Sequence, residues 1–156
     1  MAARGYTARS GSSGTVSTPV ALAAGVAKSV VGVLGASGDS INVDELGISF
    51  DGVTSAAVPA LVELLEISAL GTMTAFTPQQ TYGPVIASSA SAGYNASGEP
   101  TIVAVKFAWY VPVFNGLLVV QYPLGKEPSV AASRGFALRV NAPAVVNCLP
   151  YISYSE

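Results

Sequence analysis

Four segments of the chain have the apolar patterning of β-strands. Apolar residues occupy alternate positions in residues 46–50 (LGISF) and 136–140 (FALRV). Because successive side chains of a strand point to opposite faces, this period of two predicts strands with one buried and one exposed face. Residues 26–34 and 145–154 are largely apolar runs of strand length. We therefore expect four strands here.

A further pair of strands is predicted by composition. Residues 101–111 (TIVAVKFAWYV) and 117–122 (LLVVQY) are rich in β-branched and aromatic residues, which favour strands. Asn115-Gly116 lies between them, and these two residue types tolerate the positive φ of a tight turn. The pattern predicts a β-hairpin.

Residues 59–70 (PALVELLEISAL) fit both a helix and a strand. Local propensity favours the helix. The preceding Asp51-Gly52 turn follows a predicted strand, however, and neighbouring antiparallel strands usually pair. We prefer the strand.

Two polar regions frame the predicted domain organisation. Residues 1–18 are rich in Gly, Ser and Thr, the composition of a flexible or partner-docked N-terminal arm. Residues 19–156 are predicted to form one domain. Within it, residues 71–100 show no sustained period and predict a long loop, and loops of this length are usually functional or partner-bound.

The order of these elements predicts an all-β fold. Short strands follow one another with turn residues between them, and no alternation of strands with helices is visible. A chain of 156 residues has the length of one domain. We expect an antiparallel β-sandwich, jelly-roll-like, with an extended N-terminal arm.

The composition changes this picture because charge is scarce. Charged residues make up 10% of the chain, whereas an average soluble domain has about 25%. Apolar residues make up 51%, and the mean hydropathy is +0.53. A β-sandwich with so few charges is expected to be covered by other polypeptides, so we predict a structural role in an assembly.

Two partner classes are disfavoured. The seven Lys and Arg residues against nine Asp and Glu form no cationic cluster, so nucleic-acid binding is not expected. No stretch reaches about 18 uninterrupted apolar residues, so no membrane-spanning segment is predicted.

Catalytic chemistry finds little support in the sequence. The chain has no His, the commonest general base and metal ligand near neutral pH. The neighbours Asp44 and Glu45 are expected to point to opposite faces of a strand, as are Glu63 and Glu66. We therefore predict that the protein is not an enzyme and has no catalytic residue, metal ligand or cofactor.

Partner contacts are predicted on the arm and the long loop. Tyrosine suits interfaces because its ring is apolar and its hydroxyl is polar. The predicted interface residues are Arg4, Tyr6, Arg9, Phe76, Tyr82 and Tyr94.

Three phrases carry a resemblance to a known family. They are LGISFDGVTSAAVPALVELL at residues 46–65, LLVVQYPLGKEPSVAA at 117–132 and FALRVNAPAVVNCLPYISYSE at 136–156. They resemble a family of small virion structural proteins of tailed bacteriophages. The resemblance covers about two thirds of the chain and is most specific in the C-terminal phrase.

The resemblance implies a component of the virion, in particular a capsid decoration or cement protein on the capsid surface. Such a protein binds the major capsid protein, often has a jelly-roll or related sandwich fold, and often forms trimers. The resemblance assigns no catalytic residue. The alternatives are a receptor- or glycan-binding head of a tail fibre and another head or tail structural subunit.

Overall fold

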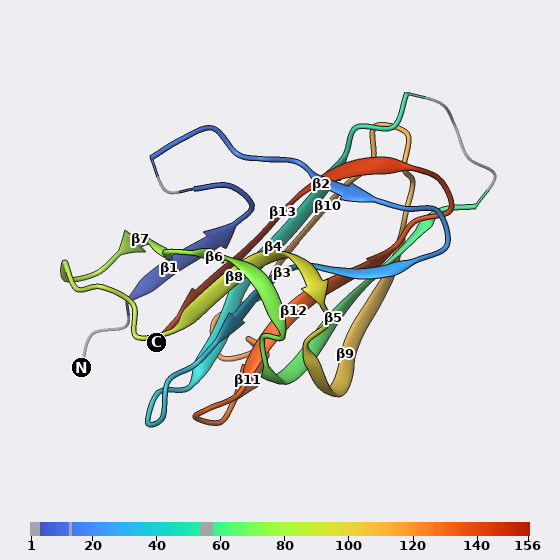
Figure 1. Cartoon of the computed structure of the whole chain (residues 1–156). Coiled ribbons are helices and arrows are strands. Elements are labelled where there is room, and N and C mark those ends of the chain that lie inside the picture. Colours follow the sequence, from blue (N-terminus) through green and yellow to red (C-terminus); the bar gives the residue numbers. More distant parts are fainter. Residues whose placement is uncertain (1–3, 13, 54–57) are drawn as a thin grey trace.

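The computed structural model describes residues 4–12, 14–53 and 58–156, and this part of the chain is all-β. Two antiparallel sheets pack face to face (Figure 1). The structure thereby confirms the predicted antiparallel β-sandwich, while the jelly-roll winding of its strands stays a prediction.

The first sheet has seven strands. Along its main path they are ordered β10 (Leu117–Gln121), β4 (Ile41–Phe50), β13 (Val146–Ser155), β1 (Gly5–Arg9) and β7 (Gln79–Tyr82). Two short strands extend it, β2 (Val20–Leu22) beside β13 and β11 (Ser129–Val130) beside β4.

The second sheet has six strands. They are ordered β6 (Thr72–Phe76), β8 (Ser91–Gly98), β3 (Ala27–Leu34), β12 (Gly135–Asn141), β5 (Ala60–Ala69) and β9 (Thr101–Val111). The chain crosses between the sheets at eight connections, β2 to β3, β3 to β4, β4 to β5, β6 to β7, β7 to β8, β9 to β10, β11 to β12 and β12 to β13. These crossings tie the two layers together.

The core lies between the sheets. Its largest fully buried side chains are those of Tyr6, Tyr154, Phe136, Leu22, Ile41, Leu46, Ile48, Leu64, Leu138 and Ile152. The alternate residues expected to be buried in 46–50 and 136–140 are buried here. The two-residue period in the sequence therefore identified the side of each strand that faces the core.

Residues 60–69 form strand β5, as preferred from the sequence. Leu64 belongs to the main core, and its neighbour Leu65 belongs to a second, smaller cluster with Ile67 and Ala137. Because neighbouring strand residues point to opposite faces, β5 is dry on both faces. This explains why its sequence lacks a clean period.

The predicted hairpin between residues 101–111 and 117–122 is wrong. Strand β9 pairs with β5 in one sheet, and β10 pairs with β4 in the other. Asn115 has the positive φ that its residue type tolerates, 49°. The turn was recognised correctly, but it carries the chain from one sheet to the other.

The prediction of a flexible or partner-docked N-terminal arm is corrected as well. Residues 5–9 form β1 between β13 and β7, and the side chains of Tyr6 and Ala8 are fully buried. Two apolar residues at alternate positions give this segment a buried face that its Gly, Ser and Thr content obscured. Residues 1–3 and 13 lie outside the described residues.

The loop predicted over residues 71–100 contains strands β6, β7 and β8. Small residues in β8 permit close packing by β6. A Cβ on Gly93 would lie 2.7 Å from the Cβ of Met73, closer than two such atoms approach. The small and polar residues of these strands thus gave residues 71–100 the composition of a loop.

Candidate functional site

Strands β9 and β10 form one edge of each sheet, on the same side of the sandwich. We call this side the open flank. β9 has 11 residues and spans about 37 Å at the usual rise of an antiparallel strand. Because β9 pairs only with β5, the backbone donors and acceptors on its other side have no strand partner among the described residues.

Apolar side chains cover the open flank. They belong to Ile102, Val103, Val105, Phe107, Tyr110, Phe114, Leu117 and Val119, and they are 38% to 73% exposed. Together they expose on the order of 800 Å², if a large side chain contributes ~200 Å² when fully exposed. The largest apolar patch of a monomer is usually about 300–600 Å², and one side of a standard interface buries about 800 Å².

An aromatic cluster fills the gap between the two edges. The Phe107 ring lies 5.9 Å from the Trp109 ring and 5.8 Å from the Tyr122 ring, measured between centroids. Trp109 and Tyr122 also pack against the main core. Burial raises the pKa of the Tyr122 hydroxyl, which has no hydrogen-bond partner within the described part of the chain. The cluster joins the exposed apolar surface to the core.

Charge on the open flank is neutralised locally. Lys106 is the one charged residue of β9 and β10. Its Nζ lies 2.6 Å from Oε2 of Glu66 on the neighbouring strand β5. An approaching neutral surface therefore meets little net charge.

The turns at one end of the sandwich form a second apolar surface. Residues 23–26, 112–116 and 142–146 gather there, at the upper right of Figure 1. Bridges between Ala24 and Ala142 and between Gly52 and Phe114 connect the turns.

We call this end the loop end. Its exposed large apolar side chains are those of Val26, Val53, Val58, Phe114 and Val145. Phe114 belongs to both surfaces, so the loop end continues into the open flank.

Three hollows open on the loop end. The largest, about 520 Å³, is walled mainly by aliphatic side chains, among them Val26, Ala96 and Val145. Lys28 and Glu99 are its charged residues. The others measure about 230 and 210 Å³ and include Val53 and Val58, respectively. Hollows of this size are suited to one or a few side chains of a partner protein.

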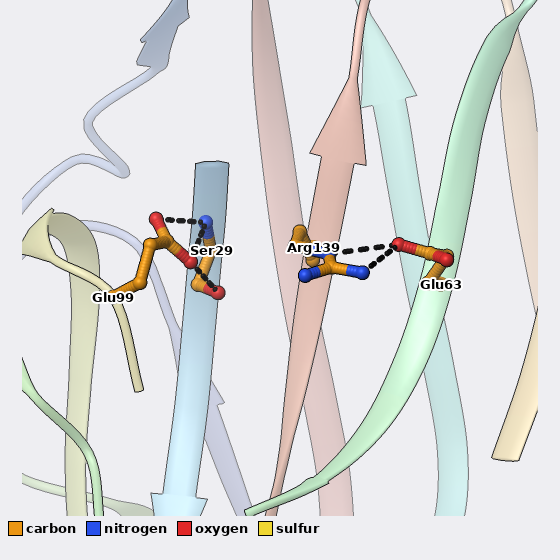
Figure 2. Close-up of polar contacts among 4 residues, drawn as sticks. All are labelled: Ser29, Glu63, Glu99 and Arg139. Atoms are coloured by element: carbon orange, nitrogen blue, oxygen red, sulfur yellow. Dashed lines mark hydrogen bonds and ion pairs between the residues drawn. The ribbon is translucent and has the colours of Figure 1, made fainter. Parts of the chain in front are cut away.

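Charged groups behind this end are held by contacts within the chain. The Glu99 carboxylate accepts hydrogen bonds from the backbone N–H of Ser29, at 2.9 and 3.1 Å, and from its hydroxyl, at 2.5 Å (Figure 2). Nε and Nη2 of Arg139 both contact Oε2 of Glu63 at 2.8 Å. Because Glu63 and Glu66 bind different cations, they do not form a carboxylate pair.

Asp44 and Glu45, in contrast, lie on the same face of the first sheet. The pairing of β4 with β13 shifts between Glu45 and Val43, so Asp44 is the extra residue of a β-bulge. A bulge re-aims a side chain, which makes the prediction of opposite faces wrong. Asp44 accepts hydrogen bonds from Tyr82 and Ser155, each at 3.1 Å.

These two carboxylates line a hollow of about 380 Å³ that we call the acidic hollow. Tyr82, Tyr122 and Glu127 contribute to its walls. Burial is the main reason why the pKa of Asp44 is raised. Among the described residues, no three His, Cys, Asp or Glu side chains are grouped to hold a metal ion.

The six predicted interface residues are placed very differently. Tyr6 and Phe76 are buried, so the prediction that they contact a partner is wrong. The Tyr6 hydroxyl donates to the carbonyl oxygen of Ile86 at 2.9 Å, and its ring centroid lies 5.7 Å from that of Tyr154. Tyr94 is partly buried against the core.

One of the two cationic candidates, Arg9, is engaged within the chain. Arg9 lies 5.6 Å from the Phe76 ring, and it donates from Nη1 to the Ser17 hydroxyl at 2.9 Å. Arg4 is half-buried. Of the six residues, Tyr82 alone is exposed as predicted.

No family model, curated protein or solved structure matches this chain. Across residues 4–12, 14–53 and 58–156, no helix is long and apolar enough to cross a bilayer.

Sequence reasoning missed the open flank and the loop end. The apolar residues of 101–111 were recognised as a strand, but a run that is apolar on both faces is typical of a central, buried strand. The single Lys106 in eleven residues gave no sign of an edge, because edge strands usually carry more charge.

Proposed function

We propose that this protein is a bacteriophage virion structural protein, a capsid decoration or cement protein that binds the outside of the shell and bridges major capsid subunits. The resemblance of residues 46–65, 117–132 and 136–156 to virion structural proteins suggests this class. The observation that supports it best is the loop end, where exposed aliphatic side chains surround three hollows.

The loop end suits adhesion to a protein shell. Its hollows open on the surface, so each accepts one or a few side chains from a capsid subunit and contributes a modest free energy of binding. When several copies are held together, these contacts add through multivalency. A trimer, as the resemblance implies, presents three loop ends to neighbouring capsid subunits and links them.

Binding of the purified protein to empty shells of the cognate major capsid protein tests the proposal. Val145→Glu places a charge at the rim of the largest hollow and is expected to lower shell occupancy strongly. The control Val85→Glu changes another highly exposed valine, outside the loop end, and is expected to leave occupancy unchanged. Absence of wild-type binding, or equal occupancy for both variants, contradicts the proposal.

The acidic hollow supports a second candidate, a glycan-binding head. Sugars stack on aromatic rings and donate hydroxyl hydrogen bonds to carboxylates. Tyr82 and Asp44 offer both groups side by side. A glycan array tests this candidate, with Tyr82→Ala expected to lose the signal and Tyr110→Ala, an exposed tyrosine elsewhere, expected to retain it. An array without wild-type signal eliminates it.

A further inference from the structure

The two edges of the open flank run in opposite directions. β9 runs toward the loop end, the chain turns there at residues 112–116, and β10 runs away from it (Figure 1). The contact between the rings of Phe107 and Tyr122 places these residues at the same level along the flank. Counting in opposite directions from this pair puts Tyr110 level with Val119.

We propose that the open flank is covered by a second copy of this chain, with β9 of one copy pairing antiparallel with β10 of the next about a rotation axis parallel to the strands. Such a rotation keeps the direction of every strand, so β9 meets a neighbouring β10 that runs the opposite way. The pairing continues the antiparallel arrangement found throughout both sheets.

The symmetry also sets the register. A closed rotation involves no shift along its axis, so residues at the same level meet. Tyr110 and Val119 are exposed on the outer faces of their sheets, and the rotation brings these outer faces together on one side of the joined sheet. Tyr110 of one copy then lies beside Val119 of the next, apolar against apolar.

Area and charge favour a second copy as the occupant. The flank exposes on the order of 800 Å² of apolar surface, which matches the ~800 Å² that each partner buries in a standard interface. Lys106 is already paired with Glu66, so no like charges face each other when two flanks meet.

The choice of a rotation axis parallel to the strands rests on the proposed function. With the axis along the strands, every loop end points to the same side and reaches one shell. The rival arrangement, β9 against β9 about a two-fold axis perpendicular to the sheet, points the loop ends in opposite directions. The two arrangements bring different residues into contact.

Cross-linking of single-cysteine variants distinguishes them, with no capsid present. Tyr110→Cys and Val119→Cys are co-expressed with different tags and treated with a short bismaleimide. The native Cys148 is buried, and burial raises its thiol pKa to about 12, so it contributes little background. We expect a cross-link between the two variants in the mixture and its loss when either variant is expressed alone.

Several results overturn the inference. They are a wild-type mass of one chain in solution, no cross-link in the mixture, or cross-linking of either single variant with itself. Ala108→Cys with Gln121→Cys, the next exposed pair at equal level, provides a second test if a first variant does not fold. A cross-linked oligomer that fails to bind shells contradicts the proposed function alone, whereas a monomer that binds shells contradicts only this inference.

Discussion

The two flanks of the sandwich solve the same edge problem in different ways. On the flank opposite β9 and β10, the edge strands β6 and β7 have five and four residues. The segment 77–90, which contains β7, crosses from one sheet to the other and back and covers this side. We call it the closed flank. The open flank has an edge of 11 residues and no covering segment among the described residues.

Hydrogen bonds hold the covering segment in place. The hydroxyl of Ser88 lies 2.8 Å from that of Tyr154 and donates to Glu156 at 2.6 Å, and the hydroxyl of Ser89 donates to Asp39 at 2.7 Å. Unpaired sheet edges invite association unless they are short, charged or covered. The chain protects one flank by itself, so the difference between the flanks indicates where another polypeptide is needed.

The largest expected effect compares one phenylalanine from each flank. Phe76→Ala on the closed flank removes a buried ring beneath Arg9 and is expected to lower the free energy of unfolding by about 3 kcal/mol. Phe107→Ala on the open flank removes a half-exposed ring and is expected to cost about 1 kcal/mol. Urea unfolding measures both, at concentrations too low for self-association. Equal losses would remove the distinction between the flanks.

A charge placed on the open flank is expected to act on association and to leave stability nearly unchanged. Val119 points outward, so Val119→Lys places an unpaired charge against the apolar ring of Tyr110 from the next copy, where the proposed contact removes it from water. We expect at least a ~10-fold weaker association, measured by sedimentation, which corresponds to about 1.4 kcal/mol. Val85→Lys, on the closed flank's covering segment, is the matched control. A similar loss in both variants contradicts an interface on the open flank.

The sequence predicted the fold class because local patterns encode it. In β4 and β12 alternate apolar residues face the core between the sheets, and this period of two identified both strands, although Ala137 on the other face of β12 is buried as well. In β5 both faces are dry, so only the neighbouring turn favoured the strand. The pairing of β9 and β10 failed for a different reason, since a tight turn specifies a reversal of direction but not which strands share a sheet.

The candidate surfaces were less accessible to sequence reasoning. Tyr6 resembled an exposed residue of a polar arm, and only its long-range pairing with β13 makes it a core residue. Asp44 was placed on the wrong face because a bulge depends on the partner strand and leaves no local signature. The exposure of β9 and β10 likewise depends on the order of strands in each sheet, which the local sequence does not specify.

The smallest expected effect concerns the contact between the closed flank's Tyr82 and Asp44. Burial raises the pKa of Asp44 above its ordinary 3.8, so the folded protein still holds this proton at a pH where the unfolded chain has lost it. The free energy of unfolding therefore decreases through Asp44 as the pH rises through about 4. Asp44→Asn removes this decrease, and near neutral pH the variant is expected to match or exceed the wild type by less than about 1 kcal/mol.

Asp51 at the loop end provides a control of opposite sign. Hydrogen bonds from the side chain and the backbone of Asn147 lower the pKa of Asp51. Its contribution to stability is present above the ordinary carboxyl pKa and is lost as the pH falls through the lowered value. Urea unfolding between about pH 3 and pH 6 measures both effects. If Asp44→Asn and Asp51→Asn change the pH profile in the same direction, Asp44 does not titrate as a buried carboxyl, and its hydrogen bonds with Tyr82 and Ser155 dominate instead.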